Sequence, residues 1–207
     1  VTPRRQRQMC ISDRPDGVRV IMVDVVYNGD PAAGEKELEP MRNIGTPVVD
    51  GVMVQDYTVL QTINDVPFGH GIRSYAKNGM VKQWSQGLID TMLEADDPRV
   101  FVGNHVAGGA VKRVGELDTA FPHRNAEIMI VIAGGWMDPA QDEELIAASR
   151  AYHKALEPHL GGYYDNIDFD GAEVPGNYGP NYARLQEIKG RYDPGNLFRL
   201  NSNIEPA

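Results

Sequence analysis

The most apolar run of the chain, from Ile128 to Ala133, places the strongest constraint on its fold. Six consecutive apolar residues predict a β-strand that is covered on both faces. An amphipathic helix is predicted soon after it, with Asp138 as the N-cap and Pro139 in the first helical position. Such a strand beside such a helix requires packed layers of sheet and helix. The helix is expected to bury one stripe of side chains, namely Leu145, Ala148, Tyr152 and Leu156.

Other segments extend this mixture of strands and helices. Two β-rich runs flank a Pro-Asp-Gly turn at 15–17, which is a hairpin signal. The second run begins at Val18 and is nearly apolar on both faces, so it is predicted to lie in the middle of a sheet. Helices are predicted from Pro31, with Asp30 as N-cap, and around Leu88. The turns are too short for repeated parallel crossovers, so the predicted fold class is α+β, with an antiparallel β-sheet and helices packed on one face.

Composition narrows the possible partners. The chain has 207 residues and a formal net charge of −9, which argues against a nucleic-acid partner because phosphate backbones demand a basic surface. No apolar run approaches the roughly 20 residues that span a bilayer, so no membrane partner is expected. The first residues, VTPRRQRQ, contain no apolar signal-peptide core, which favours a cytoplasmic location. The initial Val suggests a piece of a longer protein.

The sequence contains few motifs that are typical of metal binding, phosphate binding or catalysis. Cys10 is the single cysteine and the five histidines are scattered, so no disulfide and no metal site are predicted. The glycine-rich stretches at 105–111 and 132–136 do not match a phosphate-binding loop and are interpreted as turns. No Gly-x-Ser-x-Gly sequence marks a hydrolase nucleophile. His123 is predicted to play a structural, hydrogen-bonding role.

The C-terminal stretch carries the remaining signal. A helix is predicted from Pro180 to about residue 189, where a glycine stops it. On that helix Asn181 shares its inward side with Leu185 and Ile188. Two interpretations stay open: Asn181 caps the local backbone, or Asn181 and Tyr178 face a flat polar ligand.

The tail resembles the C-terminal signature of the berberine bridge enzyme-like family of FAD-linked oxidases. In that family an aromatic-Gly-x-Asn-Tyr-x-Arg-Leu stretch is followed by a helix and by Tyr-Asp-Pro-x-Asn-x-Phe. The resemblance extends to TAFPHR, YNGDPAAGEKELEPMR and GIRSYAKN, and so covers essentially the whole chain. The matching tail residues are Tyr178, Gly179, Asn181, Tyr182, Arg184, Leu185, Tyr192, Asp193, Pro194, Asn196 and Phe198.

The resemblance implies that two parts of the chain have different roles. Residues 1–160 correspond to a substrate-binding domain. Residues 161–207, called the tail below, correspond to a berberine-like C-terminal segment. This segment packs on an FAD-binding domain that is missing from this chain. FAD is then bound mainly by that missing half, with Tyr178, Asn181 and Asn166 beside the flavin. Tyr164 lines the same cleft and is the candidate catalytic residue.

The chain departs from the family pattern at one point. Plant members place a polar or acidic residue in the strand after Phe-Pro-His-Arg, where this chain has Val131 and Ile132. These side chains are predicted to line the substrate pocket, but they cannot move a proton. The expected function is that of the substrate-binding half of an FAD-dependent oxidoreductase, which oxidises an alcohol, sugar or secondary metabolite by hydride transfer to flavin. The isolated chain is expected to be inactive. The alternative is a flavin-free α+β binding module of the same fold that has lost catalysis.

Overall fold

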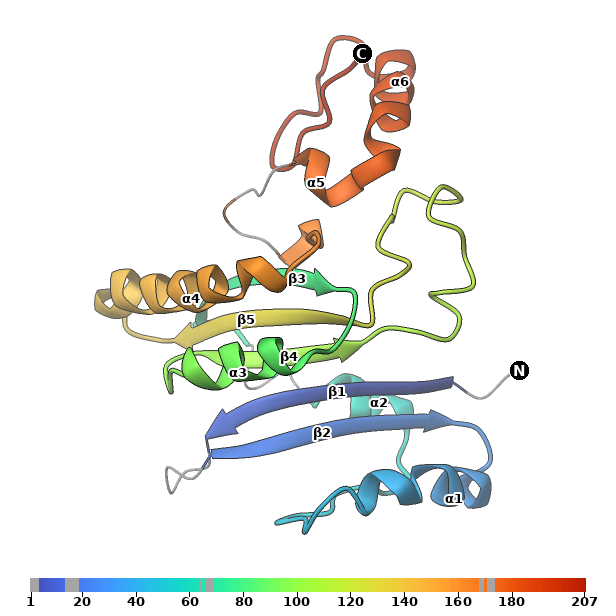
Figure 1. The fold of residues 1–207 in the computed structure, drawn as a ribbon, viewed down its shortest axis with the longest axis vertical. Coiled ribbons are helices and arrows are strands. Elements are labelled where there is room, and N and C mark those ends of the chain that lie inside the picture. Colours follow the sequence, from blue (N-terminus) through green and yellow to red (C-terminus); the bar gives the residue numbers. More distant parts are fainter. Residues whose placement is uncertain (1–3, 14–18, 64, 66–68, 168–169, 171–173) are drawn as a thin grey trace.

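A computed structural model describes the chain except for residues 1–3, 14–18, 64, 66–68, 168–169 and 171–173, and it describes only the backbone at 4–13 and 19. Strands and helices are mixed along the described part (Figure 1). In chain order the elements are β1 (Arg4–Asp13), β2 (Arg19–Asn28), α1 (Pro31–Arg42), α2 (Tyr57–Gln61), β3 (Arg73–Val81), α3 (Gln86–Glu94), β4 (Phe101–Val106), β5 (Ile128–Trp136), α4 (Asp142–Leu156), α5 (Val174–Tyr178) and α6 (Tyr182–Tyr192), with 3₁₀ turns at Pro139–Gln141, Glu157–His159, Asp165–Ile167 and Gly179–Asn181.

The described strands form one five-stranded sheet in the order β2-β1-β4-β5-β3, and every neighbouring pair is antiparallel. β1 and β2 pair along their whole length, as expected for hairpin arms. The predicted turn at 15–17 lies outside the described residues. β5 pairs with β4 on one side and β3 on the other, so it is central to the part of the sheet that carries most of the core.

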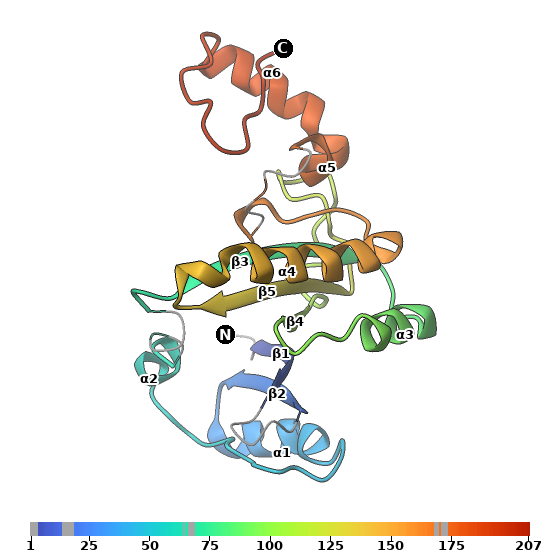
Figure 2. The same ribbon diagram turned by 90° about the vertical axis from the view of Figure 1, so that its left-hand side faces the viewer.

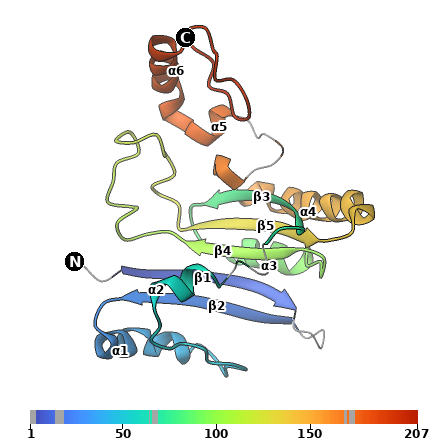
Figure 3. The same ribbon diagram turned by 180° about the vertical axis from the view of Figure 1, so that it is seen from behind.

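Helices α1, α3 and α4 lie on one face of this sheet. α4 lies across β3 and β5, and α3 lies beside α4 (Figures 1 and 2). α1 packs on β2, where the ring of Tyr27 lies against Gly34, and the strand register places this contact on the same face. The short α2 lies on the other side (Figure 3). The α+β class, with an antiparallel sheet and helices on one face, is therefore confirmed.

Alternate residues of β5 form the centre of the core. Ile128, Ile130 and Ile132 are fully buried beneath α3 and α4. The hydroxyl of Tyr152 in α4 donates a hydrogen bond of 2.9 Å to the carbonyl of Met92 in α3, so the two helices are also joined to each other. The buried stripe predicted for α4 is confirmed at Leu145, Ala148, Tyr152 and Leu156.

β5 is covered on one face only, so the prediction of cover on both faces is wrong. Its other alternate residues are half-buried or exposed, because no helix of the α1, α3 and α4 layer reaches them. We call this second surface of β3, β4 and β5 the open face. By register its residues are Ser74, Ala76, Asn78 and Met80 of β3, Phe101, Gly103 and His105 of β4, and Met129, Val131, Ala133 and Gly135 of β5.

β2 also departs from expectation. Its apolar sequence predicts a place in the middle of the sheet, but β2 is an edge strand. Ile21, Met22 and Val23 are 66%, 45% and 36% exposed. An apolar pattern indicates that a strand is buried by packing, but it does not indicate which part of a protein packs against it. Unpaired apolar edges favour association with another strand or surface.

The chain after α4 returns along the free edge of β3. Met80 donates a backbone hydrogen bond of 2.8 Å to Gly162, and Gly161 donates one of the same length to Met80. Leu160 lies over Gly79 so closely that a Cβ at Gly79 would stand 2.5 Å from a Leu160 methyl carbon. Residues 160–162 thus complete the edge of the sheet.

Replacing neighbouring residues of β5 tests the two faces. Ile132→Ala empties a filled core position and is expected to lower the free energy of unfolding by about 2–5 kcal/mol. Val131→Ala on the open face is expected to cost about 1 kcal/mol or less, because its side chain is already partly in water. Urea denaturation of both variants measures the difference, and equal losses would contradict the one-sided cover of β5.

Two truncations test the predicted boundary after residue 160. A chain ending at Leu160 keeps the sheet, α3 and α4, but loses the backbone bonds between Met80 and the next two residues. A chain ending at Asn166 keeps them. Both are expected to unfold cooperatively in thermal melts followed by circular dichroism, with the lower melting temperature in the shorter chain. A non-cooperative melt of the longer chain would show that the tail belongs to this core.

Candidate functional site

The open face is a shallow, mostly apolar floor. Small residues, Gly103, Ala133 and Gly135, leave its middle low, and the larger side chains Phe101 and Met129 border them. An antiparallel sheet that faces water normally carries polar side chains on that face. A contiguous apolar surface in their place marks a site for a ligand or another protein surface.

Tyr164 is held at the β3 edge of this floor. The side-chain amide of Asn78 donates to the Tyr164 carbonyl at 2.8 Å and accepts from the Tyr164 N–H at 2.7 Å. Asn78 is opposite Val131 in the ladder, so Tyr164 is anchored at the level of that residue. The Tyr164 hydroxyl accepts a 2.9 Å hydrogen bond from Asn166, and its ring meets Phe121 edge-on at 6.3 Å. The structure therefore brings the predicted residues Tyr164 and Asn166 together, and it attaches the backbone of Tyr164 to Asn78, the β3 partner of Val131.

Asp165 joins parts of the tail to one another, and His123 ties the tail to the loop before β5. Asp165 accepts hydrogen bonds from the Asn177 amide, at 2.9 Å, and from the Ser202 hydroxyl. His123 lies 3.1 Å from the Asn177 carbonyl through Nε2, which agrees with its predicted structural role. Burial lowers the pKa of His123, although its hydrogen bonds to the carbonyls of Asn177 and Tyr163 act in the opposite direction.

Tyr178 and Asn181 lie further along this connection. Burial, followed by the charge of Asp165, raises the pKa of Tyr178, so its phenol stays protonated at neutral pH. Asn181 is buried, and its amide donates a 2.7 Å hydrogen bond to the Glu116 carbonyl in the loop between β4 and β5. Its side chain makes no capping bond to its own helix, so the capping interpretation of Asn181 is wrong.

The helix after Asn181 also differs from prediction. α6 begins at Tyr182 and passes through Gly190 to Tyr192, because Gly179–Asn181 forms a separate 3₁₀ turn. Ile188 is 42% exposed, so the predicted inward stripe does not reach it. At Gly190 an added Cβ would stand 3.2 Å from the carbonyl of Ala207. That close approach explains a glycine inside a helix, where it otherwise costs about 1 kcal/mol.

Ile132 does not belong to this site. Neighbouring residues of a strand point to opposite faces, so Val131 on the open face requires Ile132 on the other. Ile132 is fully buried in the core beneath the helices. Its prediction as a substrate-pocket residue is therefore corrected, whereas Val131 remains on the candidate surface.

Sequence reasoning missed His105. It lies on the open face of β4 directly opposite Met129, and its side chain is half-buried. Burial lowers the pKa of its imidazole. The sequence at 105–111 predicts a glycine-rich turn, but the strand continues to Val106. The period-two spacing of Phe101, Gly103 and His105 was the available signal.

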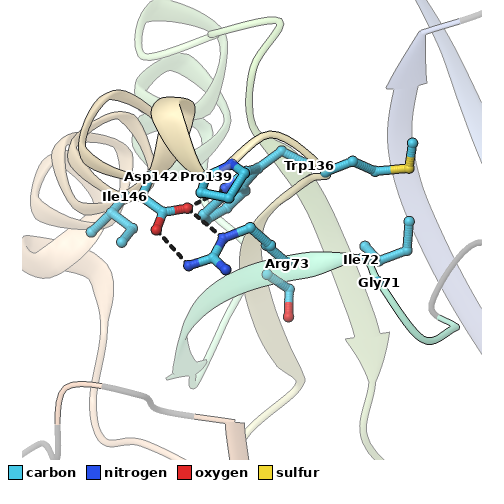
Figure 4. Close-up of a pocket in the computed structure, with 9 residues that line it drawn as sticks. Gly71, Ile72, Arg73, Trp136, Pro139, Asp142 and Ile146 are labelled. Carbon is cyan, nitrogen blue, oxygen red and sulfur yellow. Dashed lines mark hydrogen bonds and ion pairs between the residues drawn. The ribbon is translucent and has the colours of Figure 1, made fainter.

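A separate cavity of about 450 Å³ lies at the opposite end of β3 and β5 (Figure 4). Figure 4 shows Arg73 and Trp136 converging on Asp142, the first residue of α4. Arg73 forms a bidentate ion pair with Asp142, and the indole N–H of Trp136 donates to the same carboxylate at 2.6 Å. These contacts hold the pKa of Asp142 below its usual range. The carboxylate is thereby occupied in holding the start of α4, so this cavity is the weaker candidate.

Two properties of the described residues limit the chemistry of this chain. Within the described ranges, no three His, Cys, Asp or Glu side chains are grouped so that they could hold a metal ion. Of the helices that the structure describes, none has the length and apolar character needed to cross a bilayer.

Comparison with known proteins connects this arrangement with flavoenzymes. Residues 164–205 match the family model described as berberine and berberine like. An FAD-linked oxidoreductase of Dictyostelium discoideum is 29% identical over 203 residues, which are 95% of this chain and 44% of that protein. The aclacinomycin-N/aclacinomycin-A oxidase of Streptomyces galilaeus is 30% identical over 150 residues, or 60% of this chain and 28% of that protein.

Solved structures extend the likeness to the fold. The berberine bridge enzyme-like 1 protein of Physcomitrella patens superimposes with a TM-score of 0.80 at 20% identity, covering 98% of this chain and 47% of that one. The tail match and these relatives support an oxidoreductase role for the chain and a place in the berberine bridge enzyme-like family of FAD-linked oxidases. The chain spans about half the length of the relatives it matches most fully.

Removing the Asn181 amide should loosen the tail. Asn181→Ala removes a buried amide and its hydrogen bond to the Glu116 carbonyl, and is expected to lower the free energy of unfolding by about 0.5–1.5 kcal/mol in urea denaturation. Asn166→Ala is the matched control, because its amide is exposed and should cost less than about 0.5 kcal/mol. Equal stability of the Asn181 variant and the parent would show that this bond contributes nothing.

Proposed function

We propose that this chain is the substrate-binding part of an FAD-dependent oxidoreductase that oxidises an alcohol, a sugar or a secondary metabolite. The observation that carries the proposal is the open apolar face with Tyr164 and Asn166 held at its rim. The match to an FAD-linked oxidase family supports the redox chemistry. The aclacinomycin oxidase, named for aclacinomycins, supports secondary metabolites as one substrate class.

The open face fits a flat aromatic ring system. At Ala133 and Gly135, which carry little or no side chain, a planar group has room to approach the backbone, and apolar side chains surround these positions. Tyr178, Asn166 and Asn181 are the proposed residues beside the flavin. FAD, when bound, would supply the oxidant for this chemistry, as the acceptor of a hydride from the substrate carbon.

The residues of this chain would bind and orient the substrate and exclude water from it. Tyr164 remains the proposed catalytic residue, since Asn166 fixes its hydroxyl and Asn78 fixes its backbone. Residues 161–207 would join this surface to an FAD-binding domain that supplies most contacts to the cofactor. That domain is the proposed cover for part of the apolar surface that the described residues leave open.

The test uses this chain expressed together with an FAD-binding domain of the family in one protein. We expect that protein to purify with flavin, and the flavin to lose its visible absorbance on anaerobic mixing with a compound from a panel of alcohols, sugars and secondary metabolites. The isolated 207-residue chain should purify without stoichiometric flavin. A flavin-containing complete protein that no member of the panel reduces would contradict the proposal.

The alternative is a flavin-free binding module. The apolar Val131, in a strand where plant relatives carry a polar or acidic residue, is the observation that favours it. A complete protein that purifies colourless, yet binds a panel compound in calorimetry, would support this alternative.

A further inference from the structure

We propose that His105 is the group that accepts the substrate proton on the open face, an inference that rests on the proposed function. His105 lies in β4 opposite Met129 in β5, and Val131 follows Met129 on the same face two residues later. The imidazole therefore stands on the same floor as the residue beside which Tyr164 is anchored. Val131 cannot take a proton, and among the residues that the described register places on the open face the histidine is His105.

Oxidation of a hydroxyl-bearing carbon removes two groups from the substrate, a hydride from the carbon and a proton from the oxygen. The C–H bond breaks and its electron pair leaves with the hydrogen as hydride, for which the proposed FAD is the oxidant. The O–H bond also breaks, and its electron pair forms the new carbonyl bond while the proton goes to a base. A neutral imidazole nitrogen can form the new N–H bond, and the resulting imidazolium passes the proton to water.

The state of His105 suits this task. The ring is half-buried, and burial lowers its pKa from the ordinary value of 6.5, so it is neutral and able to accept a proton at pH 7. The phenol of Tyr178 is a poorer base, since burial and Asp165 raise its pKa. No side chain described in the structure donates a hydrogen bond to His105 or accepts one from it, which leaves the imidazole available to a ligand.

The strands beside His105 carry few charged side chains close to its imidazole. Met129 and Met80 continue its row across β5 and β3, and neither carries a charge. On the other side, Gln8 of β1 separates it in the register from Asp24 of β2, about 10 Å away at two strand spacings. Burial raises the pKa of Asp24.

The loop that follows β4 contributes further charged groups to this end of the sheet. Lys112 forms an ion pair of 4.0 Å with Glu127, and Arg124 lies over the ring of Phe121. Glu116 supplies the carbonyl that Asn181 binds. Burial lowers the pKa of His105, and no charged partner contributes to this shift.

The first measurement uses the isolated chain and needs no cofactor. Titration of the histidine ring signals by NMR, with His105→Gln to assign the resonance, should give His105 a pKa below 6.5. A value at or above 6.5 would overturn the proposal, because the ring would then be substantially protonated near neutral pH.

The second measurement uses the complete flavoprotein described above. His105→Gln and His105→Asn should lower kcat/KM by about 100-fold or more, with the flavin spectrum and melting temperature retained. In the parent, kcat/KM should rise with pH through the pKa of His105 and then level off, because only the neutral ring accepts a proton. Both variants should lose this rise. His159→Gln, in the 3₁₀ turn after α4 where the ring meets Thr91, is the matched control and should behave as the parent.

Rescue separates a chemical role from a packing role. His105→Ala should be inactive and should regain turnover on addition of imidazole. Unchanged kcat/KM and pH profile in the His105 variants would overturn this inference alone, since the parent would still reduce its flavin. A parent protein whose flavin no panel compound reduces would overturn the proposed function and this inference together.

Discussion

The alternation of side chains along β5 is the constraint on which the rest of the structure depends. Three isoleucines on one side draw α3 and α4 onto the sheet, and this packing requires the intervening residues to face the other way. Those residues are also apolar, so the strand that builds the core creates the open face by the same geometry. A one-residue shift in pairing would exchange the two surfaces, and the fully buried isoleucines therefore determine which residues a ligand can meet.

The free edge of β3 gives that surface a defined border. Asn78 is fully buried, and its amide takes the place of a further strand by bonding both backbone groups of Tyr164. Such a buried amide is costly unless it is satisfied, so this contact holds the start of the tail in one position. The hydrogen bonds of His123 and Asn181 then connect the following turns to the loop between β4 and β5. A rim made of tail and loop is thereby carried by a rigid sheet.

The sequence pattern predicted the features that depend on residues a few positions apart. The α4 stripe, the start of α1 after Asp30 and the antiparallel sheet all follow from spacing and capping signals that act within a few residues. The position of β2 could not be predicted in this way, because an apolar strand can be covered by segments beyond its neighbours. The partner of Asn181 lies 65 residues away, so helix spacing indicated that it pointed inward but not what it met. His105 was missed because the glycines after Val106 suggested a turn that begins only once the strand has ended.

The contact between Arg73, Trp136 and Asp142 has a consequence for how the protein responds to acid. The pKa of Asp142 is depressed in the folded chain, so its contribution to stability is present above the unfolded value of about 3.9 and fades as the pH falls below it. The same direction holds for Asp170, whose carboxylate pairs with Arg150 further along α4. Acid therefore releases α4 from its polar attachments at the start and in the middle, while its apolar stripe still holds it to the sheet. Loss of these polar attachments before the apolar packing is a route to a compact state with native-like helices and loosened tertiary order.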